Sequence, residues 1–205
     1  MRIISGLYKG RKIPNVFNVK EVNPSSDIVK GALFNILAGE IQGKIFFDVY
    51  AGTGNIGFEA LSRGAGFCVF IEKLNKMTSY ISKIANEFNI RDKTKIICGD
   101  ANKFINKDLF NSYKPNFIFI DPPYDYNLAE KSLENIINSY YLSNSGNGLD
   151  NDKDIDKDTA DLDNNLTIIV QHNKKEILQD NYEEFYLTKK STYGKSALSF
   201  YEKLP

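Results

Sequence analysis

The chain has 205 residues, of which 42% are hydrophobic, and its 26 acidic side chains balance its 26 basic ones. That length and composition are typical of one globular domain whose core needs no disulfides, which excludes fibrous, disordered and disulfide-framework proteins. No run approaches about 18 consecutive apolar residues and no signal-peptide pattern opens the chain, so we expect a cytoplasmic monomer with no membrane contact.

Residues 1–22 predict a small, basic β-hairpin ahead of the main fold. Short β-favouring pieces alternate there with two glycines and a proline. The first twenty residues contain five basic side chains and no acid, which favours contact with a polyanion. The candidates for contact with nucleic-acid phosphates are Arg2, Lys9, Arg11 and Lys12.

Residues 23–205 predict the main domain. The segment 23–27 supplies capping residues for a helix whose apolar side chains recur at helical spacing as far as Leu37. Apolar strands and helices then alternate. The predicted strands are Ile45–Tyr50, Phe67–Glu72, Lys95–Cys98, Phe117–Ile120 and Leu166–Gln171, and the predicted helices are Ile56–Arg63, Lys76–Phe88 and Leu128–Tyr140. This alternation is typical of a doubly wound, Rossmann-like α/β domain with a mostly parallel sheet covered on both faces.

The segment 143–165 interrupts this alternation. It contains seven aspartates, two lysines and few hydrophobic residues, so it predicts a disordered insertion. The spacing of Asp150, Asp152 and Asp154 resembles a calcium loop, but Ile155 replaces the glycine needed at the sixth position, and we expect no metal. The rest of the chain carries a surplus of five basic side chains, which suits a polyanionic partner.

The end of the chain predicts an antiparallel pair of strands, formed by Phe185–Leu187 and Ala197–Tyr201. The two cysteines, Cys68 and Cys98, each lie within an apolar run. They predict two buried thiols in neighbouring strands, without a disulfide or a metal, and a reducing compartment.

A glycine-rich turn follows the strand that ends at Tyr50. Gly52 and Gly54 allow the backbone to turn tightly and approach a ligand, and Gly57 permits close packing of the next helix on the sheet. Glu72 ends the next strand about twenty residues later, where a carboxylate can accept from both ribose hydroxyls. Strand, turn, helix and acid together predict a nucleotide-containing cofactor.

The turn alone fits NAD(P) as well as S-adenosylmethionine, but two acids favour the latter. Asp48 stands four residues before Gly52, where it can meet the amino group of the methionine part. Asp100 follows the third strand and can accept from the adenine amine; the alternative is that it caps the next helix. Tyr50, Thr53 and Ala101 flank these positions and complete the predicted cofactor site.

The segment Asp121-Pro122-Pro123-Tyr124 comes directly after a continuous apolar strand, at the crevice where doubly wound sheets bind ligands. It fits the methylation of an amino group on a nucleic-acid base, because such a nitrogen is a poor nucleophile. The Asp121 carboxylate and the Pro122 carbonyl can accept both N–H bonds and stabilise the charge that develops on the nitrogen. Tyr124 can stack on a flipped base.

The chain resembles the bacterial small-subunit ribosomal RNA guanine-N2 methyltransferases of the RsmD type. The resemblance is carried by the segments 1–12, 32–37, 48–57, 59–65, 72–73, 121–124 and 193–201. It implies a class I methyltransferase fold with a mostly parallel seven-stranded sheet and an antiparallel C-terminal strand. It also implies S-adenosylmethionine as the methyl donor, 16S rRNA or a small-subunit particle as the partner, and RNA contact by the basic N-terminal hairpin.

Two departures from the family pattern reduce what the resemblance implies. Several arginines of the family are missing from residues 23–31, so the resemblance does not imply RNA contact by this segment. Gln171 stands where the family has an acid before His172, and we expect this histidine to be structural.

Three other functions fit parts of the sequence. A DNA adenine-N6 or cytosine-N4 methyltransferase would share the Asp121–Tyr124 segment, but usually carries a separate recognition domain. An NAD(P)-linked oxidoreductase would use the glycine turn and give Asp121 no role. A non-catalytic RNA-binding protein on the same fold would not need the chemical residues.

Overall fold

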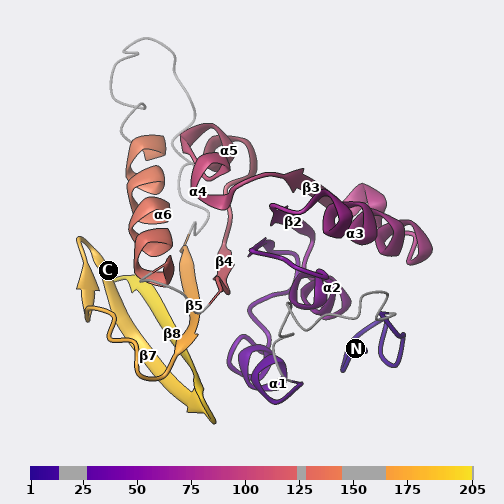
Figure 1. Ribbon diagram of the computed structural model, residues 1–205, viewed down its shortest axis with the longest axis horizontal. Coiled ribbons are helices and arrows are strands. Elements are labelled where there is room, and N and C mark those ends of the chain that lie inside the picture. The colour runs from indigo at the N-terminus through magenta and orange to yellow at the C-terminus, as the bar shows by residue number, and fades with distance from the viewer. Residues whose placement is uncertain (14–26, 124–127, 145–164, 205) are drawn as a thin grey trace, which may run out of the picture.

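The computed structural model describes residues 1–13, 27–123, 128–144 and 165–204. Within these ranges one eight-stranded sheet runs through the molecule, with helices on both faces (Figure 1). The strand order is β3-β2-β1-β4-β5-β8-β7-β6. The described helices include none that is both long and apolar enough to cross a bilayer.

Five parallel strands form the centre of the fold. They are β1 (Ile45–Val49), β2 (Phe67–Glu72), β3 (Thr94–Cys98), β4 (Phe117–Ile120) and β5 (Thr167–Asn173). Because strands β2 and β3 lie on one side of β1 and β4 and β5 lie on the other, the chain reverses direction of winding between β1 and β4. In open α/β sheets, the crevice at the carboxyl ends of the strands at such a point binds ligands.

Alternating side chains of the strands build two hydrophobic clusters, one on each face of the sheet. Phe46 and Phe70 pack on the face covered by α1 (Asp27–Ile36), α2 (Asn55–Ser62) and α3 (Asn75–Glu87). Phe47 and Ile71 pack on the opposite face. The helices there are α4 (Ala101–Phe104), α5 (Lys107–Tyr113) and α6 (Leu128–Asn144). Apolar residues on both faces of each strand explain why the sequence pattern reads as continuous apolar runs.

The structure confirms the Rossmann-like α/β class and corrects its details. Eight strands are present among the described residues instead of seven, because a two-residue strand, β6 (Asn181–Tyr182), adds to the edge. β7 (Phe185–Tyr193) and β8 (Ser196–Lys203) are longer than predicted. β8 runs antiparallel beside β5, and β7 runs antiparallel on the other side of β8. A 3-10 turn, η1 (Arg91–Lys93), precedes β3.

The N-terminal segment, residues 1–13, folds back on itself. Arg2 and Lys12 form an antiparallel bridge, and the Ile3 amide donates to the Arg11 carbonyl at 3.0 Å. Ile3 and Ile13 are fully buried in the cluster shared with α1 and α2. The predicted boundary after residue 22 lies outside the described residues.

Two further expectations need correction. Cys68 is buried as predicted, but Cys98 is exposed, because it ends β3 at the edge of the sheet. The predicted insertion at 143–165 begins too early, since α6 continues to Asn144. Residues 145–164 lie outside the described part of the chain.

Candidate active site

A cavity of about 770 Å³ lies at the carboxyl ends of β1, β2, β3 and β4. This volume lies within the range of small-molecule and cofactor sites. Nine of the predicted site residues line it, namely Asp48, Tyr50, Gly52, Thr53, Glu72, Asp100, Ala101, Asp121 and Pro122. Gly54 does not line it, and Tyr124 lies outside the described residues.

The glycine turn after β1 shapes the floor of the cavity. Gly52 has a φ of 55° and Gly54 a φ of 75°, conformations that favour glycine. A Cβ on Gly54 would lie 2.9 Å from the Phe58 ring, so the packing of α2 itself requires a glycine there. A Cβ on Gly57 would lie 2.3 Å from the Phe70 ring, which confirms the predicted close packing of this helix on the sheet.

Asp48 is buried beneath this turn. Its Oδ2 accepts from the Gly57 amide at 2.8 Å, and the residue is 2% exposed. Burial raises the pKa of the Asp48 carboxyl well above its ordinary value, and the charges of Asp121 and Glu72 raise it further. Asp48 therefore supports the turn directly, while lining the cavity where a ligand can meet it.

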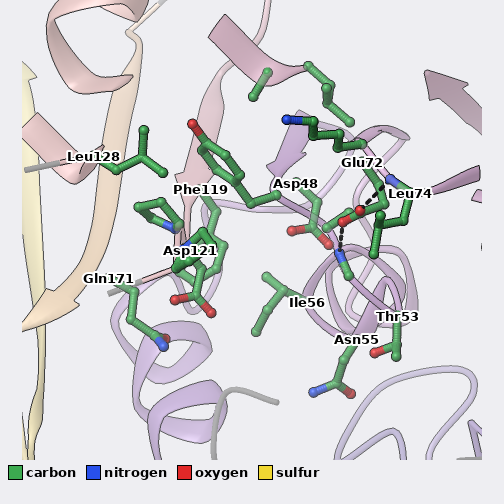
Figure 2. A pocket seen from close by; sticks show the side chains of 18 of the residues that line it. Asp48, Thr53, Asn55, Ile56, Glu72, Leu74, Phe119, Asp121, Leu128 and Gln171 are labelled. Carbon is green, nitrogen blue, oxygen red and sulfur yellow. Dashed lines mark hydrogen bonds between the residues drawn. The ribbon is translucent and has the colours of Figure 1, made fainter. Parts of the chain in front are cut away.

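Two acids stand at the ends of β2 and β3. Both oxygens of Glu72 are held by backbone amides, Oε2 by Gly52 and Oε1 by Leu74, each at 2.8 Å (Figure 2). Asp100 caps α4, because its Oδ1 accepts from the Asn102 amide at 3.1 Å. The capping interpretation of Asp100 is thus correct, and the residue also lines the cavity beside Ala101.

Tyr50 connects the turn to the helices on the other face of the sheet. Its hydroxyl lies 2.8 Å from Ser132 Oγ on α6 and accepts from Asn102 Nδ2 at 3.3 Å. Its φ of 64° is unusual for a residue other than glycine. Burial raises the pKa of the Tyr50 hydroxyl, which keeps it neutral and able to donate.

Asp121 follows β4 at the opposite side of the cavity from Glu72. Its amide lies 3.4 Å from the Val49 carbonyl, which joins the ends of β4 and β1. Figure 2 shows the side chains of Asp121 and Gln171 on the same side of the pocket. Pro122 is buried and Pro123 exposed. The arrangement presents a carboxylate at the carboxyl end of β4, beside the glycine turn.

His172 is structural, as expected from the sequence. It is fully buried, with Nε2 at 2.9 Å from Ser199 Oγ and Nδ1 at 2.9 Å from the Asn173 carbonyl oxygen. Burial lowers the pKa of the imidazole. Both ring nitrogens are therefore occupied away from the cavity.

The four basic residues proposed to contact RNA are exposed and lie outside the cavity wall. Arg11 is the most fixed of them, because its guanidinium stacks at 5.3 Å from the centre of the Tyr8 ring and 5.0 Å from that of Phe88. Arg2 and Lys12 pair across the N-terminal bridge. Lys9 lies in the turn between them.

Several polar residues of the cavity wall were not among the predicted site residues, and two of them are buried. Asn55 begins α2 and is 5% exposed, and Gln171 lies in β5 and is 3% exposed. Asn55 directly follows Gly54, so its place beside the glycine motif could have marked it. Among the described residues, no cluster of three or more His, Cys, Asp or Glu side chains could hold a metal ion.

Comparison with known proteins gives consistent matches along the chain. The family model described as Conserved hypothetical protein 95 matches residues 1–202. The chain is 26% identical over 203 residues to the putative rRNA methyltransferase YlbH of Bacillus subtilis, which covers 99% of each chain. It is 36% identical over 149 residues to the ribosomal RNA small subunit methyltransferase D of Haemophilus influenzae, which covers 69% of this chain and 73% of that protein. The solved structure of the putative methylase HI0767 from Haemophilus influenzae matches with a TM-score of 0.71 at 26% identity, covering 100% of this chain and 98% of that one.

Proposed function

The chain belongs to the family described as Conserved hypothetical protein 95, and from this premise we propose that it transfers a methyl group from S-adenosylmethionine to the N2 amine of a guanine in 16S rRNA. The observation that carries the proposal is the position of Asp121 and Pro122, at the end of β4 on the cavity that the glycine turn lines. The names of the relatives in Bacillus subtilis and Haemophilus influenzae support ribosomal RNA as the substrate.

The polar groups of the cavity fit S-adenosylmethionine. Glu72 would accept from the ribose hydroxyls, Asp100 from the adenine amine, and Asp48 from the methionine amino group. All three carboxylates line the cavity, on the ends of neighbouring strands or just after them. Gly52 brings backbone close to the same space without a side chain. When bound, the cofactor supplies an electrophilic methyl group.

Asp121 and Pro122 would act on the guanine amine. The Asp121 carboxylate accepts one N–H and the Pro122 carbonyl the other, which turns the nitrogen lone pair toward the cavity. Both acceptors also stabilise the positive charge on the nitrogen, and Asp121 can take a proton from it. Proline offers no N–H at position 122 or 123, so this short segment presents acceptors only.

An NAD(P)-linked oxidoreductase is less well supported by the same geometry. The buried Asp48 lies directly under the glycine turn, where a pyrophosphate would have to approach, and its carboxyl oxygen already takes the Gly57 amide that could donate to a phosphate. Asp121 would have no role in hydride transfer. Modification of ribosomal RNA agrees with the cytoplasmic location that we expect from the sequence.

The proposal is tested by methylation of purified RNA. The protein is incubated with methyl-labelled S-adenosylmethionine and either deproteinised small-subunit RNA or small-subunit particles, and the RNA is digested to nucleosides for mass spectrometry. We expect label in N2-methylguanosine only. A parallel reaction contains duplex DNA in place of RNA. Label in N6-methyladenine or N4-methylcytosine of that DNA would support a DNA methyltransferase instead.

Replacement of Lys9, Arg11 and Lys12 together with Ala is expected to weaken RNA binding and make it less dependent on salt. Each lost phosphate contact reduces the slope of log K against log salt by about 0.7–0.9, so three lost contacts reduce it by about two to three units. Fluorescence anisotropy with labelled RNA at several salt concentrations measures the slope.

A matched control replaces Lys83, Lys93 and Lys107 with Ala. These three substitutions remove the same charge outside the N-terminal segment. We expect a slope close to that of the wild type. Equal slopes for both triple variants would show that residues 9–12 do not contact phosphates.

A further inference from the structure

Asn55 is a buried amide with one half of its hydrogen-bonding capacity unused. It is the first residue of α2, it is 5% exposed, and it forms part of the cavity wall. Its Oδ1 accepts from Lys30 Nζ at 2.9 Å. Its Nδ2 has no hydrogen-bond partner among the described residues. A buried donor without a partner is uncommon in folded proteins and indicates a group that is supplied from elsewhere.

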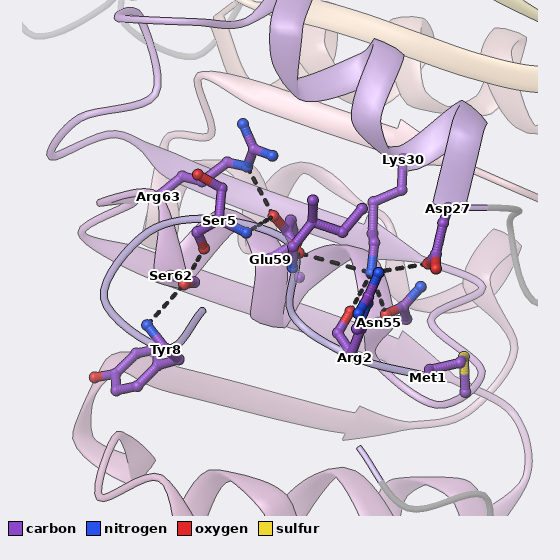
Figure 3. Close-up of polar contacts among 12 residues, drawn as sticks. Met1, Arg2, Ser5, Tyr8, Asp27, Lys30, Asn55, Glu59, Ser62 and Arg63 are labelled. Carbon is purple, nitrogen blue, oxygen red and sulfur yellow. Dashed lines mark hydrogen bonds and ion pairs between the residues drawn. The ribbon is translucent and has the colours of Figure 1, made fainter. Parts of the chain in front are cut away.

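Lys30 fixes which way the amide faces. An ammonium group only donates, so the oxygen of Asn55 must face it and the nitrogen must face away. Lys30 is itself immobilised, with Nζ at 2.7 Å from the Arg2 carbonyl oxygen and 3.6 Å from Glu59 Oε2 (Figure 3). Its side chain is fully buried. The orientation of Asn55 is therefore set by the fold.

The start of α2 also favours an anion. Gly54 caps this helix without a side-chain acceptor, and among the first amides of α2 that of Gly57 is bound by Asp48 Oδ2. The N-terminus of a helix carries partial positive charge, which stabilises a negative group placed there. Lys30 Nζ lies 2.9 Å from the amide oxygen of Asn55, and its own carboxylate partners are Glu59 and Asp27. The Asn55 amide and the helix terminus thus point to the same kind of ligand, an acceptor with negative charge.

We infer that Asn55 Nδ2, positioned by Lys30, donates a hydrogen bond to the carboxylate of the methionine part of S-adenosylmethionine. This inference rests on the proposed function. The adenine and ribose acceptors, Asp100 and Glu72, stand at the ends of β3 and β2, so the amino-acid part extends toward α2. The carboxylate is the anionic group of the cofactor, and Asn55 offers it a donor in a buried wall.

The test compares two ligands on variants of Asn55. S-adenosylhomocysteine contains the carboxylate, whereas 5′-methylthioadenosine keeps the nucleoside and lacks the amino-acid part. Asn55→Asp retains an oxygen for Lys30 but replaces the N–H donor with a second acceptor. Calorimetry is expected to show at least about tenfold weaker S-adenosylhomocysteine binding for Asn55→Asp, because a hydrogen bond to a charged group is lost and a like charge is added. Binding of 5′-methylthioadenosine should stay within about twofold of the wild type.

Two further variants make the result specific. Asn55→Ala removes the donor without adding charge, so we expect a smaller loss that is again confined to S-adenosylhomocysteine. Asn86→Asp makes the same charge change at an exposed position of α3 and should alter neither affinity. Thermal melting of each variant checks that the fold is retained.

Each outcome separates the inference from the proposed function. Wild-type affinity of Asn55→Asp and Asn55→Ala for S-adenosylhomocysteine would overturn the role of Asn55 and leave the cofactor in place. Equal losses for both ligands would overturn the assignment to the carboxylate. A wild-type protein that binds neither ligand would overturn the proposed cofactor, and the inference with it.

Discussion

Replacement of Asp121 with Ala is expected to slow methyl transfer by about 10²–10³-fold, comparable to the loss of one oxyanion-hole donor. The carboxylate would no longer accept an N–H of the target amine or stabilise its developing charge. S-adenosylhomocysteine affinity should stay within about twofold of the wild type, because none of the predicted cofactor contacts is removed. Single-turnover methylation of small-subunit RNA measures the rate, and calorimetry measures the affinity.

Asp121→Asn provides the matched control, since its amide oxygen still accepts a hydrogen bond while the charge is lost. We expect Asp121→Asn to methylate RNA at a rate between that of the wild type and that of Asp121→Ala. If both variants methylate RNA at close to the wild-type rate, the segment after β4 is only a turn. If both lose cofactor affinity in parallel with rate, Asp121 belongs to the cofactor site.

The predicted cavity residues come together because of the topology that the sequence pattern indicates. Asp48, Glu72 and Asp121 each stand at or near the carboxyl end of an apolar run. Parallel strands place these ends at one edge of the sheet, so residues far apart in the sequence meet there. The strand Phe67–Glu72 and the strand Phe117–Ile120 have the predicted bounds, since both are continuous apolar runs with clear ends.

The parts that could not be predicted depend on tertiary packing. α4 and α5 are short and polar, and their starts are marked only by the capping side chains of Asp100 and Asn106. β6 has two residues and exists only because β7 offers it an edge. Cys98 has apolar neighbours in the sequence, but its side chain is exposed because β3 is an edge strand of the sheet. The sequence pattern does not indicate which strand lies at the edge.

A buried charged cluster is the largest feature that sequence patterns conceal. Lys30 and Glu59 are both fully buried, although lysine and glutamate are ordinarily at the surface. Glu59 accepts from the amides of Ile4 and Ser5 at 2.8 and 3.0 Å, and from Arg63 Nε at 2.8 Å (Figure 3). The cluster therefore joins the N-terminal segment to α1 and α2, and it places a proposed RNA-binding element directly behind the cavity wall at Asn55.

Replacement of Glu59 with Ala is expected to lower the free energy of unfolding by about 3–5 kcal/mol. The variant removes the carboxylate that lies 3.6 Å from the buried Lys30 ammonium in the wild type. It also removes the acceptor of the Ile4 and Ser5 amides. Hydrogen exchange of these two amides should accelerate more than that of β1, because the N-terminal segment loses its attachment first. Urea unfolding monitored by circular dichroism measures the change in stability.

Glu87→Ala is the control on the neighbouring helix α3, because Glu87 pairs with Lys83 at 3.8 Å and both side chains are largely exposed. A surface pair at this spacing contributes about 0.3–0.5 kcal/mol, so the two variants should differ roughly tenfold in their effect. Equal effects would mean that the contacts of Glu59 contribute no more than a surface pair. A large effect on stability with unchanged exchange at Ile4 and Ser5 would instead show that Glu59 stabilises α2 without holding the N-terminal segment.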